Sequence, residues 1–447
     1  MNRLLNAWLI GSKRSLSQWK LLTSVVLGVI LACTIISSSF IYLDSLEEIA
    51  LNLALDDVPD QEHDLILQTK AGPVSQSQYD LLNSTASKQL SSHIGNLEQD
   101  RFSAIKSPTF FLTELGFESA AEEKVKVGAR MITLPAFSKV KDRAYFVSLP
   151  SLNENIKILS GSSEIPEYYP FFDEKNLYLG ALISNTSAEL FSLKVGDQMI
   201  AFPTWSDKYE SIVVEISGIF ERKPSGENIW YLEETVLGAS TASALRTAPF
   251  YIPQQTFLND LGSAFEKLEG TYIWYMDINP DAISANKTTE IRQRLQTLKI
   301  NLTPVLPSYS QKTKLQKILE EYDRRLFYSK LPMFVLMMLI TFICLYYISA
   351  LASMSISQRY AEIALIRSRG ATQWQTLVVF ALEAITIGAA GIILGPLIGA
   401  GAVSLLGLIE PLSSLQPNGG LLKVHIDLNT YRMSAIGGVL GIISLLI

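Results

Sequence analysis

The feature that most constrains this chain is a set of apolar runs long enough to cross a membrane. Residues 21–43 and 331–351 contain no charged side chain. A hydrocarbon core about 30 Å thick is crossed by about 20 residues of helix, so each run predicts a transmembrane helix. The whole chain is only 18% charged, against about 25% in soluble domains. The sequence therefore predicts a membrane protein and disfavours a purely cytosolic one.

Two further apolar runs extend the predicted bundle. Residues 377–409 hold one charge, Glu383. This run is too long for one straight crossing, so we expect a tilt, or a kink near Gly395 and Pro396. The last run, residues 434–447, would rise only about 21 Å as a helix, which is too short to span. We expect the natural protein to continue past it.

Charges around the first run indicate its orientation. Basic residues precede the run and acidic residues follow it: Arg3, Lys13, Arg14 and Lys20, then Asp44, Glu47 and Glu48. The positive-inside rule places the N-terminus in the cytoplasm. A cleaved signal peptide is the alternative, because the residues up to Cys33 resemble a lipoprotein cleavage box. The apolar run continues beyond Cys33, which favours an uncleaved helix.

These inferences define a fold class. We expect a membrane protein with an α-helical transmembrane bundle of four spans, the last incomplete, and a large α+β extracytoplasmic domain inserted between spans 1 and 2. Its expected parts are cytoplasmic residues 1–20, span 21–43, outer domain 44–330, span 331–352, cytoplasmic helix 353–375, span 376–409, outer loop 410–433 and the start of a fourth span at 434–447. Such a protein would be multi-pass in a bacterial inner or plasma membrane.

The outer domain has a mixed pattern. β-rich segments predict strands at residues 64–68, 144–148, 156–159, 198–202, 212–220 and 271–278. Helical spacing appears at 187–193 and 281–298. The flanks 44–54 and 310–330 are also helical in pattern, and they predict either a stalk or two surface helices that cover the domain.

Several kinds of chemistry are disfavoured. A net charge of −6 gives no basic excess for nucleic acid. His63, His93 and His425 lack metal-ligand spacing, and Cys33 and Cys344 both lie in apolar runs. Adjacent carboxylates such as residues 56–57 and 122–123 are more typical of solvated charge than of acid/base pairs. We therefore predict no catalytic, metal or cofactor site, and no enzyme activity in this chain.

Residues 357–375 read SQRYAEIALIRSRGATQWQ. Apolar Ile363 and Ile366 can share one flank while Arg359, Glu362 and Arg367 lie on the polar side, so we predict an amphipathic helix at the inner membrane surface. Gly370 is the predicted helix stop, because glycine tolerates a left-handed backbone. On this pattern alone, an ordinary membrane-surface linker fits as well.

This segment resembles the cytoplasmic signature of FtsX-like ABC transporter permeases, an RxxEIxLLRxxGAT-type helix after the second span. The matching residues are Arg359, Glu362, Ile363, Leu365, Arg367, Gly370, Ala371 and Thr372. Ala364, Ser368 and Arg369 depart from the family pattern. The third span with Glu383 also resembles the family. Residues 181–200 and 213–220 are similar to a MacB-like extracytoplasmic domain.

The resemblance implies the permease subunit of a type VII ABC transporter, in which a separate cytoplasmic ATPase binds ATP and Mg and contacts the signature helix. This chain has no phosphate-binding loop of its own. The family's implied mechanism is mechanotransmission to the outer domain, for export or extraction of a lipoprotein, peptide or drug, or for regulation of cell-wall enzymes. The implied partners are the ATPase, a second permease half and membrane lipids.

Two alternatives stay open at this point. The chain could be a membrane-tethered extracytoplasmic hydrolase, or a membrane sensor or adaptor without an ATPase. Glu383 also has two interpretations, because a carboxylate within a membrane helix is costly and is often functional. Near the cytoplasmic end of its span, however, it could pair with Arg359 or Arg367 as a structural anchor.

Overall fold

The computed structural model describes residues 19–114, 122–127, 130–135, 142–165, 176–205, 211–237, 246–368, 372–409, 421–422, 424 and 426–446. The chain divides into two compact units. The first, here called the membrane unit, comprises residues 1–54, 284–286 and 320–447. The second, the outer unit, comprises residues 55–283 and 287–319.

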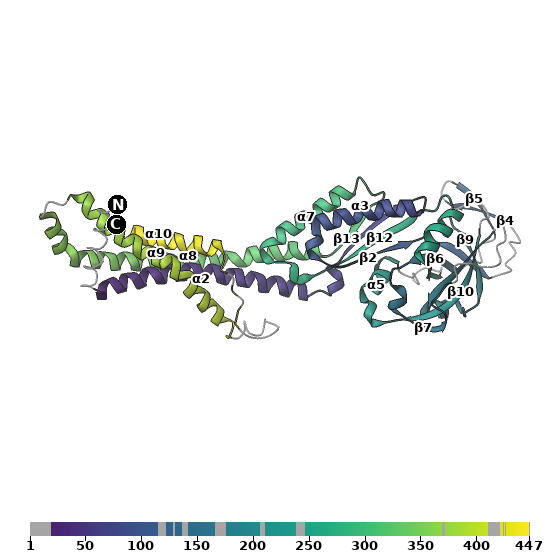
Figure 1. Cartoon of the computed structure of the whole chain (residues 1–447), viewed down its shortest axis with the longest axis horizontal. Helices are drawn as coiled ribbons and strands as arrows, with labels where there is room; N and C mark the ends of the chain where they lie inside the picture. The colour runs from purple at the N-terminus through teal and green to yellow at the C-terminus, as the bar shows by residue number, and fades with distance from the viewer. Residues whose placement is uncertain are drawn as a thin grey trace. The chain divides into compact units, whose positions relative to one another are not determined.

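Four helices contribute to the membrane unit (Figure 1). They are α2 (Trp19–Asp56), α8 (Leu315–Ser368), α9 (Gln373–Leu406) and α10 (Leu428–Leu446). Three of them contain segments long and apolar enough to cross a membrane, at Thr23–Asp56, Leu315–Ala350 and Ala384–Leu406. Both α8 and α9 continue through an internal proline, Pro332 and Pro396.

The outer unit is built on one large sheet. Its strands run in the order β11-β8-β10-β9-β3-β6-β2-β12-β1-β13, and β7 pairs with β10. Strand β11 pairs with both β8 and β6, which closes six strands into a ring. The strand bounds are β1 Leu65–Ala71, β2 Glu98–Lys106, β3 Phe110–Glu114, β6 Asp142–Ser148, β7 Ile156–Gly161, β8 Asn176–Ser184, β9 Gln198–Pro203, β10 Ser211–Arg222, β11 Arg246–Tyr251, β12 Gly270–Ile278 and β13 Ser310–Lys312.

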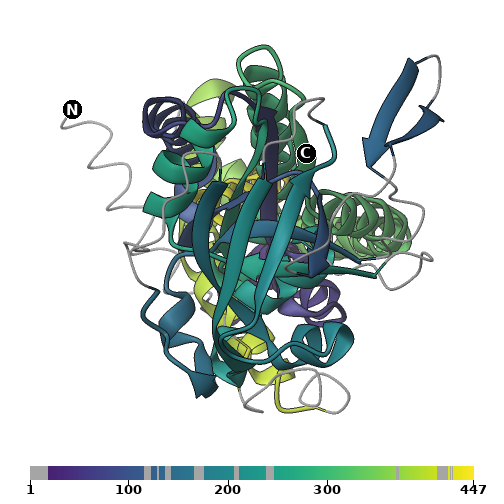
Figure 2. The same cartoon turned by 90° about the vertical axis from the view of Figure 1, so that its right-hand side faces the viewer.

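A separate hairpin joins β4 (Glu122–Val127) to β5 (Arg130–Pro135). It forms its own two-stranded sheet, which Figure 2 shows beside the larger one. The larger sheet therefore supplies the framework of the outer unit.

Helices cover the sheet. Two of them, α3 (Gln76–Ile94) and α7 (Thr288–Leu302), lie side by side (Figure 1). Leu82, Ala86, Leu90 and Ile94 of α3 recur every fourth residue and are all buried, so this face of α3 points into the core. Short helices α4 (Asn185–Phe191), α5 (Glu227–Leu232) and α6 (Gly262–Ala264) and the π-helical turns η7 (Glu233–Leu237) and η8 (Thr256–Leu261) complete the unit.

The core of the outer unit is rich in aromatic side chains. Tyr145, Phe220, Tyr251 and Tyr275 are each at most 1% exposed, and Phe220 packs edge-on against Tyr251 with 5.4 Å between ring centroids. Large buried rings contribute much of the hydrophobic stabilisation available to a domain. The outer unit therefore has a substantial core of its own.

All six predicted strand segments fall in β1, β6, β7, β9, β10 and β12. The two predicted helices correspond to α4 and α7, with shifted ends. Of the predicted stalk segments, residues 44–54 lie within α2 and residues 315–330 within α8, whereas residues 310–312 form strand β13 and are not helical. The predicted loop at residues 410–433 lies mostly outside the described residues.

Candidate functional site

The predicted signature lies at the far end of α8. Arg359, Glu362, Ile363, Leu365 and Arg367 all belong to this helix, which ends at Ser368. Gly370 and Ala371 lie outside the described residues. Thr372 is exposed and immediately precedes α9, and Glu383 lies within α9. The described signature residues thus lie at the end of α8 and, for Thr372, immediately before α9.

Helix α9 packs closely on α2 along a row of glycines. A Cβ at Gly391 would lie 3.1 Å from Val29 Cγ1, and one at Gly395 only 2.8 Å from Cys33 Cβ. One helical turn further, a Cβ at Gly399 would lie 3.1 Å from Ser37 Oγ. Such short separations leave no room for a side chain, and small residues let membrane helices approach in this way. The α2–α9 contact therefore depends on these glycines.

Helix α10 packs on α9 in the same manner. A Cβ at Gly388 would lie 2.6 Å from Ile442 Cδ1, and one at Gly438 would lie 2.5 Å from Ile392 Cγ1. The Ser434 hydroxyl donates a hydrogen bond to the Ile392 carbonyl at 3.1 Å. Van der Waals contact and a polar bond thus hold α10 to α9.

Helix α8 contacts α2 at two levels. Toward the C-terminal half of α8, Ile348 is buried in a cluster with Val29 and Cys33 of α2 and Ile387 of α9. Nearer the start of α8, a group of polar contacts joins α8 to α2. We call this group the outer clamp, and its residues are Glu47, Glu48, Ala285, Tyr322 and Lys330.

The outer clamp is centred on Glu47. The Lys330 ammonium lies 2.5 Å from Glu47 Oε1, and the Tyr322 hydroxyl donates to the Glu47 carbonyl at 2.9 Å. The neighbouring Glu48 accepts a hydrogen bond from the Ala285 amide at 3.1 Å. The Glu47 side chain is 16% exposed and Lys330 42% exposed, so the pair is partly shielded from solvent. The clamp fixes the outer part of α2 to α8.

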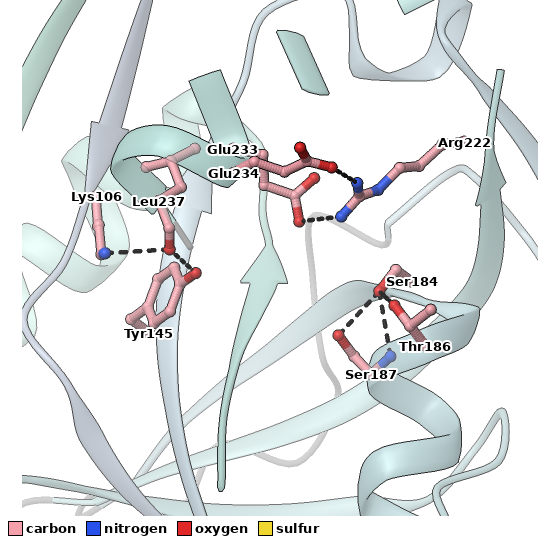
Figure 3. Close-up of polar contacts among 9 residues, drawn as sticks. All are labelled: Lys106, Tyr145, Ser184, Thr186, Ser187, Arg222, Glu233, Glu234 and Leu237. Atoms are coloured by element: carbon pink, nitrogen blue, oxygen red, sulfur yellow. Dashed lines mark hydrogen bonds and ion pairs between the residues drawn. The ribbon is translucent and has the colours of Figure 1, made fainter. Parts of the chain in front are cut away.

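Figure 3 shows two polar clusters of the outer unit that lie at η7, together with the contacts of Ser184. In the first, Tyr145 and Lys106 both donate to the Leu237 carbonyl, Lys106 at 3.2 Å. The Lys106 ammonium also lies 4.1 Å from the centroid of the Tyr145 ring. Burial lowers the pKa of Lys106 to about 8. These donors cap the end of η7, where a helix leaves carbonyls without intrahelical partners.

In the second cluster, Arg222 bridges two carboxylates of η7. It donates to Glu233 at 2.9 Å and to Glu234 at 3.2 Å (Figure 3). Glu233 is only 3% exposed, and burial raises the pKa of its carboxyl. The ion pair with Arg222 opposes that shift. Both clusters hold η7 against the sheet.

Residues 181–200 run from the end of β8 into the capped helix α4. The Ser184 hydroxyl accepts from the Ser187 amide at 3.2 Å, and it also lies 2.9 Å from the Thr186 and Ser187 hydroxyls (Figure 3). Serine is a preferred residue at such N-caps. This arrangement explains why the chain turns from β8 into α4 at this residue.

A third polar group lies where β1 begins. Asp64 is 3% exposed, and it accepts hydrogen bonds from the Tyr275 hydroxyl and from the Ile278 amide, the latter at 2.9 Å. Burial raises the pKa of Asp64 to about 6. The preceding residue, His63, is 1% exposed. Within the described residues there is no group of three His, Cys, Asp or Glu side chains that could hold a metal ion.

Sequence reasoning did not identify the outer clamp. In the sequence, Glu47 indicates only orientation and Lys330 marks only the end of the expected outer domain. The available signal was their placement, because each is a charge beside an apolar run of membrane length. Opposite charges at the same end of two neighbouring spans are candidates for an ion pair.

Comparison with known proteins finds a family that matches part of this chain. Residues 334–447 match the FtsX-like permease C-terminal family. The chain is also similar to a solved domain of a protein described as a permease from Porphyromonas gingivalis, at 12% identity, covering 57% of this chain and 89% of that domain, with a TM-score of 0.23. That score is too low to support an argument about the fold. Among curated proteins, none matches this chain.

Proposed function

We propose that this chain is the permease subunit of an ABC transporter and works with a separate cytoplasmic ATPase, because residues 334–447 match the FtsX-like permease C-terminal family. The ATPase would hold ATP and Mg, and this chain would bind no cofactor. The four helices of the membrane unit would be spans, with the N-terminus in the cytoplasm and a MacB-like outer domain between the first two.

The length of α8 carries the proposal. This helix runs unbroken for 54 residues from Leu315 to Ser368, about 80 Å at 1.5 Å per residue. It contains Lys330 of the outer clamp at one end and the signature residues Arg359 to Arg367 at the other. A displacement at the signature would therefore move Lys330 through one continuous helix, in which Pro332 has no backbone N–H to donate.

The outer clamp would then pass the movement to α2. Lys330 and Tyr322 of α8 both bind Glu47 of α2, so the two helices would move together outside the membrane. Transmission of this kind needs two states that the ATPase binds with different affinity. ATP binding by the partner would supply that difference, and the outer domain would respond on the far side of the membrane.

The same proposal covers the molecule that is transported or regulated. A lipoprotein, peptide or drug that is extracted or exported, or a cell-wall enzyme that is regulated, would act at the outer domain. The described residues of that domain show structural polar clusters around η7 and β1, and these hold elements of the fold together. We therefore propose that the outer domain acts by moving and binding, with the chemistry left to partners.

The test is co-purification of the detergent-solubilised chain with ABC ATPases encoded beside it, followed by ATP turnover. We expect a stable complex whose turnover changes in a Glu362→Lys variant, because that substitution reverses a charge within the signature. A matched control is Glu320→Lys, which reverses an exposed charge at the other end of the same helix. If no ATPase binds, the sensor and hydrolase alternatives take precedence.

A further inference from the structure

The outer end of α8 orders its side chains by polarity. Three carboxylates lie farthest from the apolar run 331–351, two arginines follow, and two aromatic rings lie closest to the run: Glu320, Glu321 and Asp323, then Arg324 and Arg325, then Phe327 and Tyr328. At a membrane surface, aromatic rings lie at the level of the lipid headgroups and basic side chains lie beside phosphates. The order along α8 is therefore the one expected where a helix leaves a membrane.

Arg324, Tyr328 and Leu331 lie on one face of α8, because they follow one another at intervals of four and three residues. Tyr328 and Leu331 are 70% and 59% exposed, and Arg324 is exposed as well. The clamp residues Tyr322 and Lys330 point toward α2 instead, since both bind Glu47. The face that carries Arg324 and Tyr328 is thus uncovered by the described residues of the chain.

Close carboxylates do not neutralise the two arginines. Among the described residues, Arg324 has no ion-pair partner, and this includes Glu320, one helical turn away. Arg325 lies 3.9 Å from Glu321, and its side chain is 79% exposed, so this pair contributes little. Two guanidinium groups are therefore available to an anion. A guanidinium fits the oxygens of a phosphate particularly well, because it can donate two parallel hydrogen bonds.

The depth of these side chains fits the headgroup layer. Measured along the helix from Leu331, the first residue of the uncharged run, Tyr328 lies about 5 Å away and Arg324 about 10 Å away. The headgroup layer is about 5–8 Å thick on each side of the hydrocarbon core. Tyr328 would therefore lie at headgroup level, and the long side chain of Arg324 would reach the outer edge of the same layer.

We propose that Arg324, Arg325 and Tyr328 bind the phosphate of an anionic phospholipid whose acyl chains lie along Leu331 and Val335. Both apolar side chains are exposed, Val335 by 61%, and the Tyr328 hydroxyl can donate a further hydrogen bond to the phosphate. A zwitterionic lipid carries an ammonium group that the arginines repel, so the net charge of the headgroup sets the preference. This inference rests on the proposed function for its membrane setting, and it specifies the lipid by its headgroup charge.

Native mass spectrometry of the detergent-solubilised full chain tests the proposal, with phosphatidylglycerol or phosphatidylcholine added. We expect phosphatidylglycerol to bind about tenfold more tightly, and the Arg324→Gln/Arg325→Gln double variant to lose most of this preference. The matched control is Lys88→Gln/Lys267→Gln, which removes the same charge from two exposed positions of the outer unit. That control should keep the preference of the wild type.

Two further measurements identify the molecule that occupies this face. An excess of inorganic phosphate should leave phosphatidylglycerol bound, because free phosphate lacks the acyl chains that contact Leu331 and Val335. A photoreactive side chain in place of Tyr328 should cross-link mainly to lipid in vesicles that contain phosphatidylglycerol. Displacement of the lipid by phosphate would mean a site for a soluble anion, and cross-linking mainly to protein would mean that a protein covers the face.

Either of those two outcomes would overturn the proposal, and so would equal affinity for the two lipids or an unchanged preference in the double arginine variant. None of these assays contains an ATPase or nucleotide. Failure to bind an ATPase would therefore contradict the proposed function while leaving the lipid result intact, and the converse also holds.

Discussion

Lys330 of α8 and Glu47 of α2 form an ion pair 2.5 Å long, although 283 residues separate them in sequence. The Glu47 backbone carbonyl also accepts a hydrogen bond from the Tyr322 hydroxyl. One position on α2 is therefore held by two side chains of α8. This relationship joins the two helices at the point where they leave the apolar part of the chain.

Reversal of one charge in the Lys330–Glu47 pair should weaken the transmission of movement from α8 to α2. We expect Lys330→Glu to place two carboxylates together and to reduce ATP turnover stimulation, with a loss of stability of about 1 kcal/mol because the pair is partly exposed. The Lys330→Glu/Glu47→Lys double variant restores opposite charges and should recover much of the effect. Turnover and thermal unfolding of these two variants, of Glu47→Lys alone and of the wild type measure the coupling. Equal turnover in all of them would mean that the pair has no part in transmission.

The glycine row of α9 should be intolerant of even one methyl group. At Gly395 an added Cβ would lie 2.8 Å from Cys33 Cβ and 3.0 Å from its carbonyl carbon, so we expect Gly395→Ala to cost about 1–3 kcal/mol through overpacking. Gly401 has nothing within 4 Å of an added Cβ. Gly401→Ala should therefore be neutral or stabilise the helix by up to about 1 kcal/mol. Thermal unfolding in detergent would compare the two, and similar losses in both would contradict this packing.

Stability of the outer unit should depend on pH through Asp64. Its pKa is raised to about 6 by burial, above an unfolded value of about 3.9. Folding therefore favours the protonated form of Asp64. The stabilisation that this carboxyl gives the folded state is complete below about pH 4 and is lost as pH rises through about 6. The difference between the folded and unfolded pKa values corresponds to about 3 kcal/mol of stability.

An Asp64→Asn variant should remove that dependence. The amide keeps an acceptor for the Tyr275 hydroxyl or the Ile278 amide but carries no charge, so its unfolding midpoint should change less between pH 4.5 and 7.5 than that of the wild type. Denaturant unfolding at both pH values measures the effect. A Glu266→Gln variant, at an exposed position of the same unit, controls for the loss of one carboxylate. Parallel pH profiles for wild type and Asp64→Asn would contradict the assignment.

Local patterns in the sequence account for much of the fold. Segments such as residues 212–220 and 271–278 alternate or concentrate β-branched and aromatic side chains, and both are strands. Apolar runs with at most one charge likewise predict the long helices α2, α8 and α9. In each case a few neighbouring residues carry the signal.

Other features depend on distant residues and could not be read locally. The six-stranded ring closes only because Arg246 to Tyr251 pair with Asp142 to Val147, about one hundred residues earlier. The sequence pattern does not predict helix α3, because its buried residues form a single narrow row on an otherwise polar helix. The outer clamp and the polar clusters around η7 also join separate segments, so their partners were not apparent from spacing.

The central claim is that an ATPase acts on this chain through the end of α8. The most direct measurement is ATP turnover by the co-purified complex in lipid vesicles, with wild type and the Glu362→Lys variant at equal occupancy of the ATPase. We expect that the wild-type chain changes turnover and that the Glu362→Lys variant largely loses this effect, while its outer unit unfolds at the wild-type temperature. Identical turnover with the two chains, or with no chain present, would contradict it.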